Sequence, residues 1–169
     1  PVMAKHVVWA VVFATIAALF QSVLLSRLRI YGAVPDLSLG VLVFSAYVNG
    51  AMNGQITGFF SGLLYDFLSA SPLGLHTFIR TIIGALGGLL RGTFFLDRVV
   101  LPMILCAAAT VLKGLLLFVL HLFFAESIPA YSLSGPVFWV ELLLNIFTAP
   151  LLFGLLKHFK PLLVSREEN

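Results

Sequence analysis

The chain has 169 residues, of which 60% are hydrophobic and only 10% are charged, and its mean hydropathy is +1.08. A water-soluble domain of this size could not keep so apolar a surface in solution, so the composition indicates an integral membrane protein. The formal net charge of +3 is spread over connecting segments. This pattern favours contact with anionic membrane lipids, and no nucleic-acid partner is predicted.

Six apolar segments follow one another along the chain, and the second and third are short. They are residues 7–25, 37–48, 56–68, 74–90, 99–124 and 137–156. The first segment is long and lacks a small-residue cleavage site, so we expect a retained helix and not a signal peptide. The sequence therefore predicts an all-α polytopic membrane helix bundle of about six transmembrane helices, in one domain that covers residues 1–169.

The second segment opens with Pro35 and Asp36, which we expect to form a helix cap motif. The carboxylate of an N-cap aspartate accepts free backbone N–H groups and favours the positive end of the helix. As one helix, residues 37–68 would measure about 48 Å, against roughly 30 Å of hydrocarbon. We expect a turn around residues 49–54 to divide this stretch into two short helices; a single kinked span is the alternative.

Glycines recur every four residues in two rows, and each row carries one charge. The first row is Gly50, Gly54, Gly58 and Gly62, continued by Asp66, and the second is Arg80, Gly84, Gly88 and Gly92. Because four residues are close to one helical turn, each row forms a groove that another backbone can approach closely. We expect helix packing at these rows, with one face left to receive a partner's transmembrane helix.

Charged side chains inside apolar segments need partners, because a charge in hydrocarbon costs several kcal/mol unless it is paired or hydrated. Asp66 and Arg80 flank the turn at residues 69–74, so we expect an ion pair between two antiparallel helices, which His76 can join. Two interpretations are open: the pair only holds the two helices together near the membrane surface, or it belongs to a site that faces a partner or a ligand.

Lys113 is the deepest formal charge of the fifth segment if that segment is one straight helix. Glu141, with Asn145 one turn later on the sixth segment, is the predicted partner. Two alternatives remain open: Lys113 faces a water-filled cleft, or His121 is the neighbour of the acid.

Basic residues indicate the orientation in the membrane, because cytoplasmic connections carry an excess of Lys and Arg. Six spans with the N-terminus inside place six basic residues inside and two outside, whereas five spans with the N-terminus outside give seven to one. Both models place the C-terminus in the cytoplasm.

Catalytic and cofactor-binding patterns are not found in the sequence. Ser61 lacks the flanking residues of an intramembrane serine protease, and the four histidines have no metal-ligand spacing. The single cysteine, Cys106, is expected to be a buried thiol. We predict no enzymatic activity, no metal and no cofactor.

Three motifs carry a resemblance to a known family. Pro35-Asp36-Leu37, the stretch GLLYDFLS at residues 62–69 and the stretch PLGLH at residues 72–76 resemble the rod shape-determining protein MreD family. The resemblance covers essentially the whole chain, but its specificity lies between residues 35 and 76.

The resemblance implies a non-catalytic membrane scaffold of the bacterial cell-elongation complex, in the cytoplasmic (inner) membrane, that supports cell shape and lateral peptidoglycan synthesis. It implies contact with an MreC-like bitopic membrane protein and, indirectly, with a RodA-type glycosyltransferase, a class B transpeptidase and the MreB filament. MreD is similar in architecture to the S components of energy-coupling-factor transporters, so a substrate-binding S component of a vitamin-type transporter is the alternative function.

Overall fold

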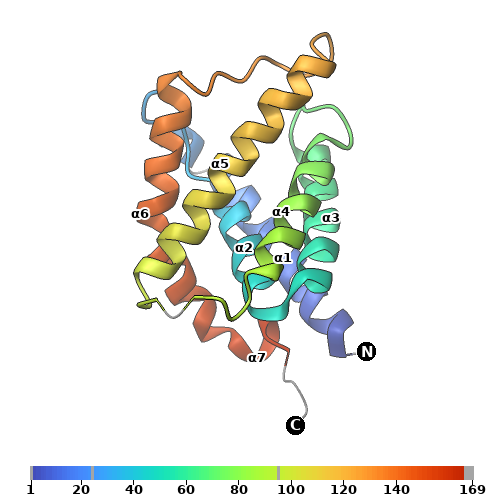
Figure 1. The fold of residues 1–169 in the computed structure, drawn as a ribbon, viewed down its shortest axis with the longest axis vertical. Helices are drawn as coiled ribbons and strands as arrows, with labels where there is room; N and C mark the ends of the chain where they lie inside the picture. Colours follow the sequence, from blue (N-terminus) through green and yellow to red (C-terminus); the bar gives the residue numbers. More distant parts are fainter. Residues whose placement is uncertain (1, 24, 95, 166–169) are drawn as a thin grey trace.

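The computed structural model describes residues 2–23, 25–94 and 96–165, and these residues are almost entirely helical (Figure 1). The helices are α1 (Val2–Val23), the 3-10 helix η1 (Leu25–Leu28), α2 (Leu37–Asn49), α3 (Ala51–Leu68), α4 (Leu75–Leu89), α5 (Val100–Phe123), α6 (Pro136–His158) and α7 (Lys160–Leu163). Within the described ranges no strand is present, and the all-α prediction is confirmed.

The helices form one bundle in which α2 is the central element. Helices α1, α3, α4, α5 and α6 all contact α2, and every residue from Ser38 to Ala46 is buried. With 13 residues α2 is only about 20 Å long, shorter than the roughly 30 Å of hydrocarbon, so surrounding helices must satisfy the free backbone groups at its ends. The beginning of α1 and helix α7 lie at one end of the bundle, and the α3–α4 turn and the α5–α6 connection lie at the other (Figure 1).

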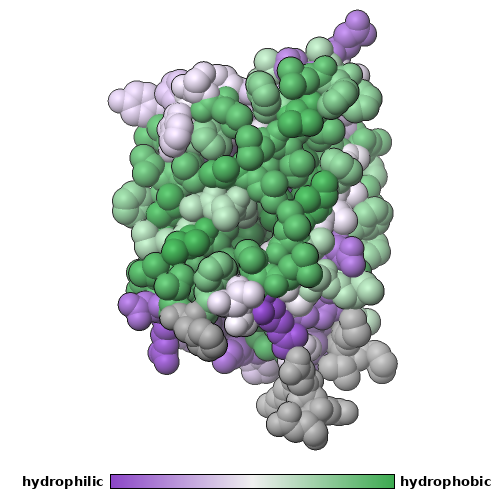
Figure 2. Space-filling model, viewed as in Figure 1, coloured by the Kyte–Doolittle hydropathy of each residue, from purple (hydrophilic) through white to green (hydrophobic). Residues whose placement is uncertain are grey.

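The outer surface has the character expected of a membrane protein. Figure 2 shows a wide hydrophobic band with hydrophilic residues gathered at the two ends of the molecule. Within the part of the chain that the structure describes, three helices are long and apolar enough to cross a membrane, over residues Ala4–Val23, Val100–Phe123 and Pro136–His158, and α2 and α4 are shorter apolar helices. The structure is thus a polytopic membrane helix bundle.

A single glycine divides the second apolar stretch into two helices. Gly50 has φ = +89°, a conformation that other residues rarely adopt, and it separates α2 from α3. Two helices are therefore present, as expected, in place of a single kinked span. The predicted turn was too long, because Asn53 and Gly54 are already helical and α3 begins at Ala51, not at residue 56.

The two glycine rows face each other and form one seam between α3 and α4. A Cβ atom at any of five glycines would lie within 2.6 Å of a backbone atom of the opposite helix; these are Gly54, Gly58, Gly62, Gly84 and Gly88. All five are buried, so the rows pack internally and leave no glycine groove for a partner. Such close approach maximises van der Waals contact where lipid offers no hydrophobic drive.

Gly92 does not belong to the seam, contrary to the sequence prediction, and Gly50 contributes only its backbone, whose carbonyl carbon lies 2.4 Å from a Cβ placed at Gly88. A Cβ at Gly50 would meet only the Arg91 side chain, at 3.7 Å, and one at Gly92 would meet nothing within 4 Å. Gly92 lies beyond the end of α4 with φ = +71°, so it serves the turn that follows the helix. Four-residue spacing predicts a shared helix face only as far as the helix extends.

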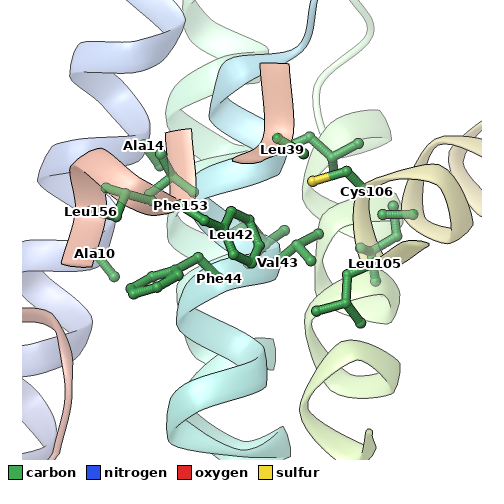
Figure 3. Packing of buried hydrophobic residues seen from close by; sticks show 14 of the residues in the cluster. Ala10, Ala14, Leu39, Leu42, Val43, Phe44, Leu105, Cys106, Phe153 and Leu156 are labelled. Atoms are coloured by element: carbon green, nitrogen blue, oxygen red, sulfur yellow. The ribbon is translucent and has the colours of Figure 1, made fainter. Parts of the chain in front are cut away.

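Apolar side chains from several helices fill the space around α2 (Figure 3). The Phe44 ring of α2 meets the Phe153 ring of α6 edge to face, with 5.2 Å between the ring centroids. Cys106 of α5 lies in the same cluster as a buried free thiol. This apolar layer holds α2 in the middle of the bundle and thereby places its first turn.

We predict that Gly58→Ala lowers the free energy of unfolding in detergent by about 1–3 kcal/mol, the usual cost of overpacking. Its Cβ would lie 2.2 Å from the Arg80 carbonyl oxygen, and a backbone atom in a seam cannot give way cheaply. The matched control is Gly154→Ala in α6, where a Cβ meets nothing within 4 Å. Equal stability of the two variants in equilibrium unfolding would contradict the seam.

Candidate functional site

The N-terminus of α2 lies inside the bundle, and Asp36 caps it there. The chain passes into the bundle before α2 begins (Figure 1). The Asp36 Oδ1 atom accepts the backbone N–H of Leu39 at 3.0 Å, so the predicted cap is present. A carboxylate at a helix N-terminus is favoured by the helix dipole, and this one is only 9% exposed.

Two cations from other helices contact the same carboxylate. Arg80 of α4 places its Nη2 atom 3.2 Å from Oδ1, and Lys113 of α5 places its Nζ atom 3.1 Å from Oδ2. Arg80 is only 2% exposed. Because a buried charge without a partner is very costly, Arg80 depends on this carboxylate, and Lys113 shares it with a second acid.

A second carboxylate balances the charge. Glu141 of α6 forms an ion pair with Lys113, as the sequence predicts, and its Oε2 atom accepts the hydroxyl of Tyr131 at 3.2 Å. Burial raises the pKa of Tyr131 to about 12, which keeps the phenol protonated as a donor. His121 bonds instead to the carbonyl oxygen of Ile128, at 2.7 Å, so the alternative in which it neighbours the acid is wrong.

Asn145 connects the charges to the backbone of α2 and to α5. Its Oδ1 atom accepts the backbone N–H of Asp36 at 2.7 Å, and its Nδ2 atom donates to the Thr110 hydroxyl at 2.8 Å. The Thr110 hydroxyl in turn donates to the Cys106 carbonyl oxygen at 2.7 Å. The polar atoms of this buried amide are therefore satisfied within the protein.

Arg80 is held on three sides. Its Nη1 atom donates to the Ser38 hydroxyl at 2.7 Å, and its guanidinium carbon lies 4.5 Å from the centroid of the Tyr65 ring. The backbone N–H of Ser38 donates to Oε1 of Gln21 in α1 at 3.1 Å. The planar guanidinium thus combines an ion pair, a hydrogen bond and a cation–π contact.

We call this set of side chains the central polar network. It consists of Gln21, Asp36, Ser38, Tyr65, Arg80, Thr110, Lys113, Tyr131, Glu141 and Asn145. Helices α1 to α6 all contribute, counting Asp36 as the cap of α2. Its four formal charges, two acidic and two basic, cancel, so the network can exist in a low-dielectric interior.

Asp66 belongs to a separate cluster, and the predicted pair between Asp66 and Arg80 is wrong. The Asp66 carboxylate accepts the backbone N–H groups of Gly74, His76 and Thr77 at 2.9–3.1 Å, and the Thr77 hydroxyl at 2.7 Å. The His76 ring also contacts it, at 3.0 Å. The turn brings the free N–H groups of the first turn of α4 to this carboxylate, while Arg80, one turn deeper, bonds to Asp36.

The arrangement suits structural cohesion better than catalysis. Each carboxylate oxygen of Asp36, Asp66 and Glu141 has a donor or cation within the protein. Over the described ranges, no group of three His, Cys, Asp or Glu side chains could hold a metal ion. Sequence reasoning missed Gln21, Ser38, Tyr65, Thr110 and Tyr131. The first four are polar side chains inside apolar segments, which is itself a signal, whereas Tyr131 lies in the connection between α5 and α6 and gave no such signal.

Comparison with known proteins gives one match. The family model described as rod shape-determining protein MreD matches residues 3–159. No curated protein and no solved structure matches the chain. The matched range includes the whole central polar network and the α3–α4 seam.

We predict that Asp36→Asn destabilises the protein strongly, by about 3–5 kcal/mol, because it leaves the buried Arg80 without its anionic partner. Arg80→Gln should cost less, because Asp36 keeps its ion pair with Lys113. In the double variant the losses should be less than additive, with a coupling of about 0.5–3 kcal/mol. The measurement is equilibrium unfolding in mixed micelles. The control is a second double-mutant cycle with Asp66→Asn and Arg80→Gln. Because these two residues do not pair, their losses of unfolding free energy should add. Coupling of Arg80 to Asp66, without coupling to Asp36, would contradict the observed pairing.

Proposed function

The chain belongs to the family of the rod shape-determining protein MreD, and on that premise we propose that it is a non-catalytic scaffold subunit of the bacterial cell-elongation complex. Proteins of this family are shape-determining membrane proteins and form part of the rod-shape complex with MreC. The proposed role is to support lateral peptidoglycan synthesis by holding membrane partners together through helix contacts.

The central polar network is the observation that carries this proposal. Its buried charges bond one another and join α2, α4, α5 and α6. A transport path or catalytic centre would need polar groups that face a substrate, whereas these groups face one another. Internal pairing of this kind supports a rigid body whose outer surface does the binding.

The proposed location is the bacterial inner membrane, with the C-terminus in the cytoplasm. The beginning of α1 and the end of α6 lie at the same end of the bundle (Figure 1), which favours six crossings, an even number, over five. Lys157, His158 and Lys160 gather at this end of the chain, as expected of a cytoplasmic face.

An apolar groove between α1 and α3 is the proposed docking surface for the single transmembrane helix of an MreC-like protein. The groove has a volume of about 580 Å³. Val7, Val8 and Val11 line it from α1, and Phe60 and Leu64 line it from α3. Residues three or four positions apart lie on one face of a helix, so α1 and α3 each present a stripe of apolar side chains to the groove. A third helix that docks between them needs two such stripes.

The glycine rows lie inside the α3–α4 seam, so the partner helix must bind elsewhere, and this groove offers the hollow that such a helix needs. The synthase pair and the MreB filament would then be reached through the MreC-like protein. The alternative, a vitamin-binding S component, needs an enclosed pocket with convergent polar groups. The α1–α3 groove is lined almost entirely by apolar side chains and does not favour that function.

The test is site-specific photocrosslinking in native membranes, with a benzophenone amino acid at Val8 or Phe60. Both side chains are exposed, and we expect crosslinks to an MreC-like protein from both positions because they face the groove. The matched control is Leu151 on α6, which is 78% exposed and outside the groove.

Crosslinks from Leu151 alone would show that the MreC-like protein binds at α6 and not in the α1–α3 groove. The proposed scaffold role would still hold in that case. The scaffold role itself would fail if affinity purification from native membranes recovered no MreC-like protein and no cell-wall polymerase. Recovery of ABC-type ATPases together with a small vitamin would support the transporter alternative.

A further inference from the structure

A polar cavity lies at the end of the bundle away from the termini and is distinct from the apolar groove. It has a volume of about 230 Å³ and lies between the C-terminal ends of α1 and α3. Its walls include Gln21 and Ser22 of α1, Ser26 of η1, and Tyr65 and Ser69 at the end of α3. Hydroxyl and amide groups thus line a hollow in a protein that is otherwise mostly apolar.

The charge of this cavity is positive. Among the described residues that line it, Arg29 is the one that is formally charged, and none is a carboxylate. Two acids close in sequence to lining residues are engaged elsewhere, since Asp36 pairs with Arg80 and Lys113, and Asp66 accepts backbone N–H groups at the start of α4. An anion that enters the cavity therefore meets a cation and polar donors.

The size and the donors favour a small anion with several oxygen atoms. A cavity of about 230 Å³ has room for about seven water molecules at roughly 30 Å³ each, which is less than drug-sized ligands occupy. A guanidinium matches the geometry of phosphate oxygens with paired hydrogen bonds, and rotatable hydroxyls such as those of Ser22 and Tyr65 can meet the remaining oxygens.

We propose that this cavity binds a phosphate group, carried either by the headgroup of an anionic phospholipid or by a small soluble organophosphate. Arg29 supplies the charge, and the hydroxyl groups of the lining supply orientation. Tyr65 forms part of the lining and also stacks on Arg80, so an occupant would lie one side chain away from the central polar network. This site is independent of the proposed docking of a partner helix, because its lining residues differ from those of the α1–α3 groove.

The experiment compares two ligand sources on delipidated protein in a non-ionic detergent. One arm titrates glycerol phosphate, and the other titrates short-chain phosphatidylglycerol with phosphatidylcholine as the zwitterionic control. Binding is followed by calorimetry and by the rise in unfolding temperature. The variants are Arg29→Gln and, as the matched control, Arg27→Gln, which removes a neighbouring exposed arginine that does not line the cavity.

We expect one of the two phosphate ligands to bind the parent and Arg27→Gln with the same affinity, and to bind Arg29→Gln about tenfold more weakly. Binding of phosphatidylglycerol alone would identify a lipid headgroup site, and binding of glycerol phosphate alone a site for a soluble ligand. The proposal would be overturned if neither ligand bound the parent protein, or if both variants weakened binding equally, since that result indicates diffuse surface attraction.

Discussion

The ion pairs and the hydrogen bond of the Asp36 carboxylate are the interactions on which the rest of the structure depends. The Asp36 side chain caps α2 and pairs with Arg80 and Lys113. The backbone N–H of Asp36 donates to Asn145. This is feasible because α2 is short and begins inside the bundle, where cations from α4 and α5 can reach its first turn. Without the carboxylate, two buried cations would lose an anionic partner, and the central helix would lose its cap.

The glycine seam between α3 and α4 determines the position of Arg80, one of those cations. Gly58 lies against the carbonyl of Arg80, and Gly54 lies against that of Gly84, so α4 approaches α3 closely at the level of the network. A bulkier residue in the seam would separate the two helices and draw the guanidinium away from Asp36 and Ser38. The small residues between α3 and α4 thus support the ion pair between Arg80 and Asp36. The seam and the central polar network together make the bundle one rigid unit.

Two features of the site and fold could be predicted from the sequence. Lys113 and Glu141 are charges inside apolar segments that need partners, and they form the predicted ion pair. The helix break required between α2 and α3 occurs at Gly50. The partner of Arg80 could not be predicted in this way, because a residue's rotational position about its helix axis matters only relative to neighbours whose packing is unknown. The same reason explains why the two glycine rows were not predicted to face each other.

The most direct measurement is hydrogen–deuterium exchange of Asp36→Asn and the parent protein, both in lipid nanodiscs. If Asp36 joins four helices, exchange should increase in the first half of α2 and also around Arg80, Lys113 and Asn145, on three further helices. Protection of the α3 side of the seam, near Gly54, should persist. An increase confined to the first turn of α2 would contradict this, because Asp36 would then act only as a helix cap.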